Sequence, residues 1–362
     1  MDFTPSEERR LLGDSLTRLL SGACSPEARN TVAYEAPFHS PALWDSLAEL
    51  GLFYAFVPET AGGMGDVAGG AGFDIVAAFE PLGRALSREP VLGQLMGLRL
   101  LAAAGAPLED ALSGQDLLAL AVFEPEAPYD LVDQTTQATA TGDKYVLQGR
   151  KSVVYGAPSA TRLLVSAWLD SALALFDVAA EAAERVDYAM VDGGGAAEVM
   201  LQDTPARILL RDAGPALETA LDAGRLALSA EAVGVAASML ETTIDYLKTR
   251  RQFGKPLAAF QALQHRAVDL TIELEQMRSI NIRAAADLEG PKGPRSVAMA
   301  KNLVGRAGRL ISEEAIQLHG GIAMTWDYPL SHYAKRLVMM DAQLGDADWQ
   351  LDRLADMAMP TP

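Results

Sequence analysis

Two long helical patterns separated by a short break constrain the fold of the C-terminal half more than any other feature. Residues 226–247 carry apolar side chains at three- and four-residue spacing, which predicts an amphipathic helix. A second pattern runs from about Ala258 to Met277 and includes Leu263, Val268, Leu270 and Ile272. In the break, Gly254 is suited to a left-handed helix C-cap, and Pro256 cannot continue the first helix.

The break itself, residues 250–257, reads Arg-Arg-Gln-Phe-Gly-Lys-Pro-Leu. Basic residues at a helix C-terminus interact favourably with the helix dipole, so a simple helix stop accounts for Arg250 and Arg251. It leaves Phe253 unexplained, together with Gln261, which the pattern places one turn into the second helix. An arginine, a phenylalanine and a glutamine in this arrangement are suited to hold a phosphate, an aromatic ring and a polar ring edge.

The distribution of helical patterns, short apolar runs and glycines along the chain predicts three domains. Residues 1–115 are mostly helical, with predicted helices near 42–50, 74–85 and 91–104, and Thr4 or Ser6 can cap the first helix. Residues 116–213 carry short apolar runs punctuated by glycines, which favours a small β-barrel or sandwich. Residues 214–362 return to helical patterns. The predicted class is α+β, with an N-terminal helical domain, a middle β domain and a C-terminal helical bundle.

Charge and composition exclude several functions. The net charge of −18 argues against nucleic acid, whose phosphates require a basic face. The single cysteine, Cys24, excludes an internal disulfide framework, and the 4 histidines are not spaced for a metal. The start of the chain lacks a signal-peptide pattern and no run of 18 apolar residues occurs, so we expect a cytoplasmic protein without a membrane segment.

A second motif, Gln317-Leu318-His319-Gly320-Gly321, ends the helical pattern that begins near Ser296. The paired glycines are a plausible helix C-cap in themselves. We predict that His319 is packed or solvated rather than a ligand.

Both motifs resemble those of the acyl-CoA dehydrogenases, and the resemblance covers nearly the whole chain. Arg-x-x-Phe-Gly-x-Pro-Leu followed by Phe-Gln is similar to the family's adenine–pyrophosphate segment, which reaches across a dimer interface to the flavin of the neighbouring subunit. The glutamine and paired glycines of the second motif contact the adenosine end of that flavin. The resemblance implies FAD as cofactor and the following cofactor-binding residues: Arg250, Gln252, Phe253, Gln261, Gln317, Gly320 and Gly321.

The chain departs from the family where the chemistry occurs. Active members place a glutamate base either about two dozen residues after the paired glycines or just before an arginine early in the first C-terminal helix. Here these positions hold Leu344 and Gly224, the latter before Arg225. Both bases are missing, so we predict no catalytic residue in this chain.

The passages that seat the flavin ring also differ. The family's Thr-Glu-Pro…Gly-Ser-Asp reads Phe123-Glu124-Pro125…Tyr129-Asp130, which replaces small hydroxyl residues by large rings. The family's Lys-x-Trp-Ile-Thr-Asn reads 151–156 as Lys-Ser-Val-Val-Tyr-Gly, without the tryptophan and threonine that cover the ring.

These differences predict the non-catalytic chain of a heteromeric acyl-CoA dehydrogenase. A related catalytic subunit, in an α2β2 heterotetramer, would supply the base and the ring pocket. By the same resemblance, we expect an acyl-CoA substrate of the steroid side-chain type and an electron acceptor of the electron-transfer flavoprotein kind. Two alternatives remain: a homo-oligomeric dehydrogenase with Asp346 as a relocated base, against which Asp346 is a simple helix N-cap, and a flavin-free binding or scaffold protein.

Overall fold

The protein is described by a computed structural model that places residues 6–65, 70–142 and 144–359. They form two compact units. Unit 1 consists of the described residues within 1–28, 70–87 and 225–362, and unit 2 of those within 29–69 and 88–224. Each unit therefore draws on separate parts of the chain.

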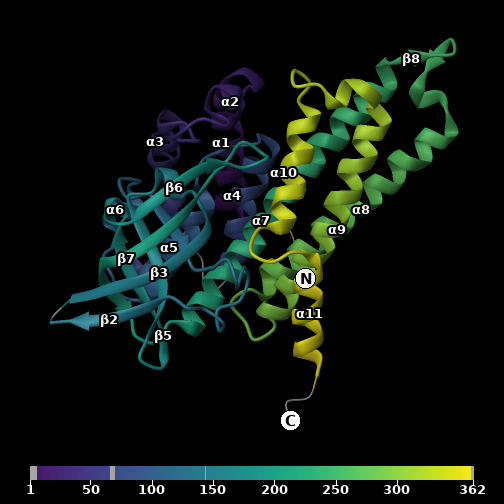
Figure 1. The fold of residues 1–362 in the computed structure, drawn as a ribbon. Helices are drawn as coiled ribbons and strands as arrows, with labels where there is room; N and C mark the ends of the chain where they lie inside the picture. The colour runs from purple at the N-terminus through teal and green to yellow at the C-terminus, as the bar shows by residue number, and fades with distance from the viewer. Residues whose placement is uncertain (1–5, 66–69, 143, 360–362) are drawn as a thin grey trace. The chain divides into compact units, whose positions relative to one another are not determined.

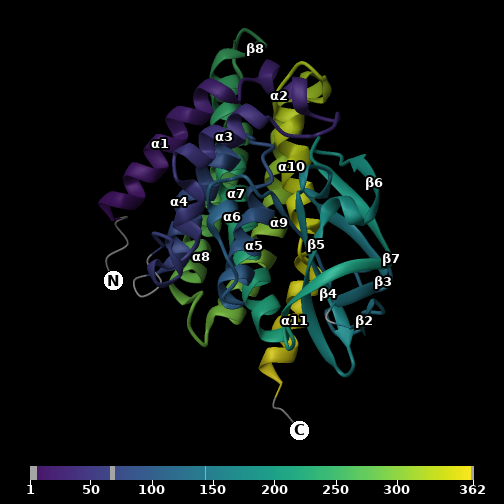
Figure 2. The same cartoon turned by 90° about the vertical axis from the view of Figure 1, so that its left-hand side faces the viewer.

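Unit 1 is a helical bundle (Figures 1 and 2). The helix α9 packs against α8, α10 and α11, and α4 packs against α1 and α8. The helices are α1 (Glu7–Ala23), α4 (Ala71–Arg84), α7 (Gly214–Thr249, which starts in unit 2), α8 (Gln261–Asp287), α9 (Gly293–His319), α10 (Leu330–Ala342) and α11 (Ala347–Ala358), with short 3-10 helices η5 (Leu257–Ala259) and η6 (Gly320–Met324).

The start of α1 confirms one of the two predicted caps. The Ser6 side chain accepts a hydrogen bond from the Arg9 backbone N–H, which satisfies one of the amide groups that a helix start leaves unpaired. Thr4 lies outside the described residues. Of the leucines on α1, Leu16 and Leu20 are buried, whereas Leu11 is exposed.

Unit 2 contains the strands, which form a sheet that closes on itself. The sheet follows the order β4-β2-β3-β7-β5, and β5 pairs again with β4. Strand β1 adds in parallel to β4, and β6 pairs with β7. The strands are β1 (Leu118–Ala121), β2 (Gln137–Thr141), β3 (Lys144–Tyr155), β4 (Arg162–Leu169), β5 (Ala172–Ala179), β6 (Glu184–Ala189) and β7 (Gly195–Leu210).

The sequence predicted a β-barrel or a sandwich, and the closed sheet is the barrel. Its interior holds an apolar core. Leu147, Leu163, Val165, Phe176 and Val199 are all fully buried there. The sequence pattern missed β6 and the long strand β7, because charged residues and a proline interrupt the alternation in β7. Unit 2 also contains the helices α2 (Pro26–Val32), α3 (Pro41–Glu49), α5 (Val91–Ala103) and α6 (Glu109–Leu112), with 3-10 helices η1 (Leu52–Phe56), η2 (Glu59–Ala61), η3 (Ala157–Ser159) and η4 (Ala180–Ala182).

The prediction that residues 226–247 form an amphipathic helix is wrong for the first half of that segment. Every residue of α7 from 220 to 237 is buried. Small residues on its other face allow this: a Cβ on Gly234 would collide with the Glu80 carbonyl of α4, so the two helices approach closely. Among the described residues, α7 is the one helix long and apolar enough to cross a membrane, and 94% of its most apolar window is buried, as in a core helix.

The second predicted helix also needs correction. It begins at Gln261, not near Ala258, because η5 precedes it and Phe260 is extended (φ −93°, ψ 118°). Val268 and Ile272, named above among its apolar residues, are 56% and 52% exposed. The helix predicted near Ser296 starts earlier, at Gly293. The three predicted domain boundaries stay a prediction, although the change from helix to strand falls between Leu112 and Leu118 and the change back between Leu210 and Gly214.

Candidate functional site

The break between α7 and α8 is a β-hairpin, not a capped helix end. Arg251–Gln252 (β8) pairs antiparallel with Lys255–Pro256 (β9), and Phe253 and Gly254 form the two-residue loop. Both loop residues have positive φ, 53° and 80°, as a type I′ turn requires. The predicted C-cap role of Gly254 is therefore wrong: its left-handed conformation serves the turn. In Figure 1 the hairpin lies at the upper end of α7 and α8.

Phe253 is placed unusually for an aromatic residue. It is 90% exposed, and its positive φ is disfavoured for a bulky side chain. Its ring meets that of Phe260 edge-on, with the centroids 6.1 Å apart, and the Lys255 ammonium lies 4.3 Å from the Phe260 centroid. An exposed aromatic ring in a strained backbone is a candidate contact for a partner or a ligand.

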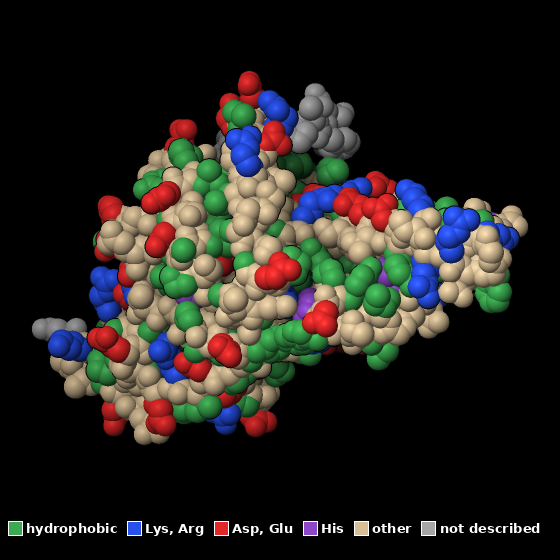
Figure 3. Space-filling view, turned by 90° about the horizontal axis from the view of Figure 1, so that it is seen from above, with side chains coloured by type: hydrophobic (Ala, Val, Ile, Leu, Met, Phe, Trp, Pro, Cys, Tyr) green, Lys and Arg blue, Asp and Glu red, His purple; other side chains and the backbone are tan. Residues whose placement is uncertain are grey.

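Basic side chains surround this ring. Arg250 and Arg251 are exposed, and neither forms an ion pair with another described residue. Figure 3 shows basic side chains (blue) at the end of the right-hand arm, where Figure 1 places β8. The base of the hairpin is closed by the Leu257 amide, which donates to the Arg250 carbonyl at 2.8 Å. This tip can therefore offer a planar apolar surface beside unpaired guanidinium groups, a combination suited to a heterocycle that carries phosphates.

The predicted glutamines beside the hairpin are exposed. Gln252 lies in β8, and Gln261 is the first residue of α8 rather than one turn inside it. Both side chains are exposed to solvent.

The second predicted motif lies at the C-terminal end of α9. The Gly320 N–H donates to the Ile316 carbonyl, and Gly320 has φ 70°, so the predicted C-cap is confirmed. No other part of the described chain lies within 4 Å of a Cβ built on Gly320 or Gly321. Because Gln317 and both glycines are exposed, their polar groups are accessible to a bound molecule.

A stacked pair of rings joins the two motifs. His319 is buried and lies face to face with Tyr246 of α7, with the centroids 4.3 Å apart, and the Tyr246 hydroxyl donates to the His319 carbonyl at 3.2 Å. Burial lowers the pKa of His319, and its Nδ1 lies 2.9 Å from the Ala315 carbonyl. Of the two predicted states of His319, packed or solvated, the structure shows the packed one. Tyr246 is one turn before Arg250, so the ends of α7 and α9 meet. Sequence reasoning missed this tyrosine, because it lies outside both motifs and beside the apolar positions of the first helical pattern.

The first base position, Leu344, lies in a buried turn whose backbone is held by buried cations. Leu344 has φ 58° and is 3% exposed. The Arg225 Nε donates to the Leu344 carbonyl at 2.9 Å. Nearby, the Lys301 ammonium donates to the carbonyls of Met340, Asp341 and Gly345 at 2.8, 2.8 and 3.0 Å. Burial lowers the pKa of Lys301 to about 7, against the attraction of the Asp341 carboxylate.

Neither base position carries a carboxylate. Leu344 is apolar, and Gly224 on α7 has no side chain. The nearby Asp346 accepts a hydrogen bond from the Trp349 N–H at 2.8 Å at the start of α11. The interpretation of Asp346 as a helix N-cap is thus confirmed.

The two passages that correspond to the ring seat lie together in unit 2. The Phe123 ring meets Tyr129 edge-on at 6.2 Å, and the Phe123 carbonyl accepts from the Ser152 amide at 2.9 Å. Val153 sits at a bulge in β3 with φ 50°, and its amide donates to the Glu198 carboxylate at 3.2 Å. Backbone groups of both passages are therefore already paired within the chain.

A buried ion pair lies beneath these passages. The Lys151 ammonium is fully buried and donates to Glu124 Oε1 and Gln134 Oε1, both at 2.8 Å. Burial raises the pKa of Glu124, but Lys151 and the donors of Thr135 and Thr136 outweigh it and hold that pKa near 2. Burial outweighs the attraction of Glu124 and lowers the pKa of Lys151 to about 8. Both groups are charged at neutral pH, and sequence reasoning had named them without pairing them.

Comparison with known proteins places these features in a family. The family model described as the acyl-CoA dehydrogenase C-terminal domain matches residues 214–359. The acyl-CoA dehydrogenase IpdE2 of Mycobacterium tuberculosis is 30% identical over 340 residues, which is 92% of this chain and 92% of that protein.

Two solved structures share the whole fold. The Tcur3481-Tcur3483 steroid ACAD has a TM-score of 0.87 and 30% identity, covering 98% of each chain. The ChsE4-ChsE5 complex from Mycobacterium tuberculosis has a TM-score of 0.90 and 26% identity, covering 100% of each chain. The predicted mixed α+β fold is thereby confirmed.

Proposed function

Because this chain belongs to the acyl-CoA dehydrogenase family, we propose that it is the non-catalytic subunit of a heteromeric, flavin-dependent acyl-CoA dehydrogenase. A related catalytic subunit contributes the base and the seat of the flavin ring. This chain completes that subunit's FAD site from across the interface, in an α2β2 assembly.

The observation that carries the proposal is the split between the two sets of positions. The residues that the family directs toward a neighbour's cofactor are present and exposed, with Phe253 held outward at the tip of a hairpin. Both base positions lack a carboxylate, and Asp346 is occupied as a helix cap. A chain that retained its own chemistry would need a general base within reach of the substrate α-proton.

The exposed groups fit the nucleotide half of FAD. The Arg250 guanidinium can pair with a pyrophosphate oxygen, the Phe253 ring can lie against the adenine, and Gln317 with the amides near Gly320 and Gly321 can bind the adenosine end. When bound, FAD supplies the acceptor for the hydride that leaves the substrate β-carbon. The residues of this chain bind and orient the cofactor and transfer no proton.

The proposed reaction is the α,β-desaturation of an acyl-CoA thioester, with electrons passed on to a carrier such as an electron-transfer flavoprotein. A steroid-CoA side chain is the proposed substrate class, supported by the likeness to a structure described as a steroid ACAD. The likeness to the ChsE4-ChsE5 complex supports an assembly of two different chains.

Flavin stoichiometry tests the proposal. The chain is expressed alone and together with a related dehydrogenase chain encoded beside it, and flavin absorbance is measured against protein mass. We expect a colourless chain alone and about one FAD per pair of chains in the complex. Two flavins per pair would show that this chain seats a flavin ring, and a yellow isolated chain would favour the homo-oligomeric alternative.

A further inference from the structure

The end of α9 is held by ring contacts with two other parts of unit 1. His319 contacts Tyr246 of α7 and Tyr328 of the segment that joins η6 to α10. Its ring is stacked on that of Tyr246, and the Tyr328 centroid lies 5.4 Å away at an interplanar angle of 54°. Both tyrosines are half-buried and His319 is 5% exposed. Rings packed in this way hold the last residue of α9 in one orientation.

The hydrogen bonds of His319 select its neutral form. Nδ1 lies 2.9 Å from the Ala315 carbonyl, which can only accept, so Nδ1 carries the proton. Nε2 is buried and has no hydrogen-bond partner among the described residues, so neither tyrosine hydroxyl reaches it. A charged ring would carry a second N–H at Nε2, and a buried donor without an acceptor is destabilising.

The groups that face the ring do not stabilise a positive charge through an ion pair. Tyr246 and Tyr328 are the titratable residues in ring contact with His319, and burial raises the pKa of Tyr328, which keeps that hydroxyl neutral. Burial also lowers the pKa of His319, against the attraction of the Ala315 carbonyl. The faces of tyrosine rings attract cations, but they offer no acceptor for the second N–H.

His319 lies where the two exposed motifs meet. It directly precedes Gly320 and Gly321, and no other part of the described chain lies within 4 Å of a Cβ on either glycine. Its carbonyl accepts a hydrogen bond from the Tyr246 hydroxyl, one turn before Arg250. A change in the orientation of His319 therefore reaches both ends of the proposed nucleotide site.

We infer that His319 is a positioning residue for the nucleotide half of FAD, and that FAD and a proton on this histidine exclude each other. The inference rests on the proposed function, because it concerns the regulation of the same site. A nucleotide at the exposed end of α9 shuts out the water that a second N–H would need. A charged ring that turns toward water instead breaks the contact with Tyr246 and displaces the neighbouring glycines.

The direction of the pH dependence follows from this competition. The pKa of His319 lies below its ordinary value of 6.5 because the ring is buried, and covering the end of α9 lowers it further. FAD binding is therefore complete above pH 6.5 and weakens as the pH falls below it, by at most about tenfold per pH unit for one proton. A surface histidine acts in the opposite sense, since the positive form of the exposed His265 would attract the pyrophosphate.

The experiment measures the dissociation constant of FAD from the purified complex between pH 5.5 and 7.5 by flavin fluorescence. In the wild-type complex we expect FAD to bind about three to ten times more weakly at pH 5.5 than at pH 7.5. His319→Phe keeps an aromatic ring in the stack and cannot take up a proton, so its affinity should vary by less than about twofold over this range.

Tyr246→Phe separates positioning from proton uptake. It removes the hydroxyl that donates to the His319 carbonyl and keeps the stacked ring. We expect FAD to bind about two to ten times more weakly at every pH, because one hydrogen bond that orients the end of α9 is lost. The pH dependence of the wild type should remain.

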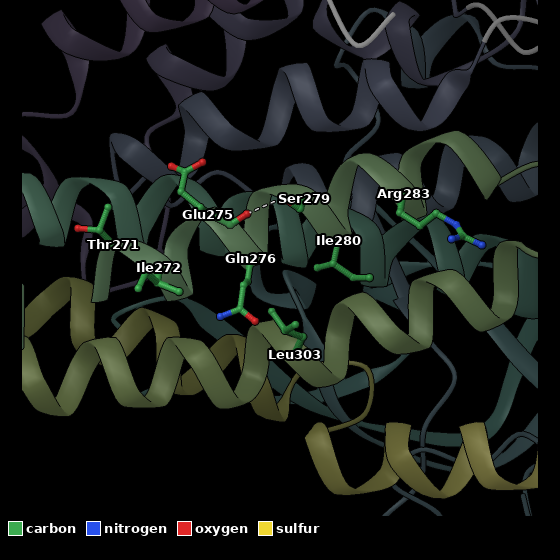
Figure 4. A pocket seen from close by; sticks show the side chains of 8 residues that line it. All are labelled: Thr271, Ile272, Glu275, Gln276, Ser279, Ile280, Arg283 and Leu303. Carbon is green, nitrogen blue, oxygen red and sulfur yellow. Dashed lines mark hydrogen bonds between the residues drawn. The ribbon is translucent and has the colours of Figure 1, made fainter. Parts of the chain in front are cut away.

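A groove in the same bundle provides the matched control. It lies between α8 and α9, and in Figure 4 the side chains of Gln276, Ile280 and Leu303 lie between the two helices. Leu303 precedes His319 by about 24 Å along α9. Gln276→Ala alters the bundle far from the stack, so the affinity for FAD and its pH dependence should both stay unchanged. His265→Gln should likewise keep the weakening in acid.

Calorimetry gives a readout that needs no variant. FAD is titrated into the FAD-free complex at pH 5.5 in two buffers of different ionisation enthalpy, which yields the number of protons released on binding. We expect a fraction of one proton per FAD to be released by the wild-type complex and none by the complex with His319→Phe.

Two results would overturn the inference: no proton released by the wild-type complex, or one pH profile shared by the wild type and His319→Phe. If Arg250→Ala still weakens FAD binding in that case, the proposed function stands without this inference. If neither Arg250→Ala nor Tyr246→Phe changes FAD binding, the chain does not complete the flavin site and the proposed function fails.

Discussion

The hairpin and the Leu344 turn differ in which chemical groups they carry and in how those groups are surrounded. In the hairpin the chemical groups are exposed and present, and little surrounds them: Phe253 is 90% exposed and Arg250 forms no ion pair with another described residue. In the turn the reverse holds. Its carbonyls are bound by Lys301 and Arg225, yet the position that would carry the base holds a leucine. The hydrogen bonds that hold this turn therefore do not depend on a reactive group at position 344, and they also stabilise the fold.

The same contrast extends to the region that corresponds to the ring seat. Phe123, which is buried, and Tyr129, which is half-buried, differ from the family's small hydroxyl residues. The neighbouring Lys151 ammonium donates hydrogen bonds to Glu124, Gln134 and the Val122 carbonyl. If this contrast is correct, substitutions at the buried lysines Lys151 and Lys301 should lower the free energy of unfolding. Substitutions in the hairpin should instead weaken FAD binding.

The largest effect is expected from Lys151→Met. It leaves the Glu124 carboxylate buried without its cation, and breaking a buried ion pair from one side costs about 3–5 kcal/mol of unfolding free energy. Urea titration monitored by circular dichroism measures it. A change below 1 kcal/mol would mean that the pair is not part of the scaffold.

The Glu124–Lys151 pair also predicts that the stability of the chain falls at low pH. The pKa of Glu124 is lowered in the folded chain to about 2 from 4.5, so its stabilising contribution is complete above about pH 4.5 and is lost as the pH falls toward 2. In Lys151→Met, part of this loss should disappear, because the cation that lowers the pKa is gone. Urea midpoints between pH 2 and 5 test this, and parallel pH profiles for the two proteins would contradict it.

Lys301→Met should cause the next largest loss of stability. It leaves three carbonyls of the turn without their donor, and each unsatisfied buried group costs about 1–3 kcal/mol, less whatever the neighbours recover. We expect a loss of about 3 kcal/mol of unfolding free energy. Lys335→Met provides the control. This lysine of α10 is half-buried, with its ammonium 5.2 Å from the Trp326 ring centroid, and the substitution should cost less stability than Lys301→Met.

Arg250→Ala should weaken FAD binding and leave the stability of the chain nearly unchanged. A charge-assisted contact to a phosphate is worth about 1.5–3 kcal/mol, so FAD retention by the assembled complex should weaken by about ten- to a hundredfold. The melting temperature should hardly change. Lys248→Ala, at the same helix end but paired with Asp245, is the matched control. Unchanged FAD affinity with a lowered melting temperature would support a helix-stop role alone.

The smallest effect is expected at Asp346. Asparagine caps helices about as well as aspartate, so Asp346→Asn should change stability by less than about 0.5 kcal/mol and leave the turnover of the complex unaltered. A relocated base would instead lose several orders of magnitude in turnover, since an amide cannot accept the α-proton. In the same assay, Gly224→Glu in the isolated chain should remain inactive, and measurable dehydrogenation would contradict the non-catalytic role.

The order of helical and β segments, the family, and the absence of a carboxylate at Gly224 and Leu344 could all be predicted from the sequence, because they follow from local periodicity, motifs and residue identity. The role of Gly254 depended on the register of β8 with β9, which a local pattern does not contain. Tertiary packing decided the exposure of Val268 and Ile272, the burial of residues 220–237 of α7 on all sides, and the pairing of Lys301 with carbonyls about 40 residues away. Periodicity states which side chains share a helix face, but which neighbour covers that face is set by contacts between segments far apart in the chain.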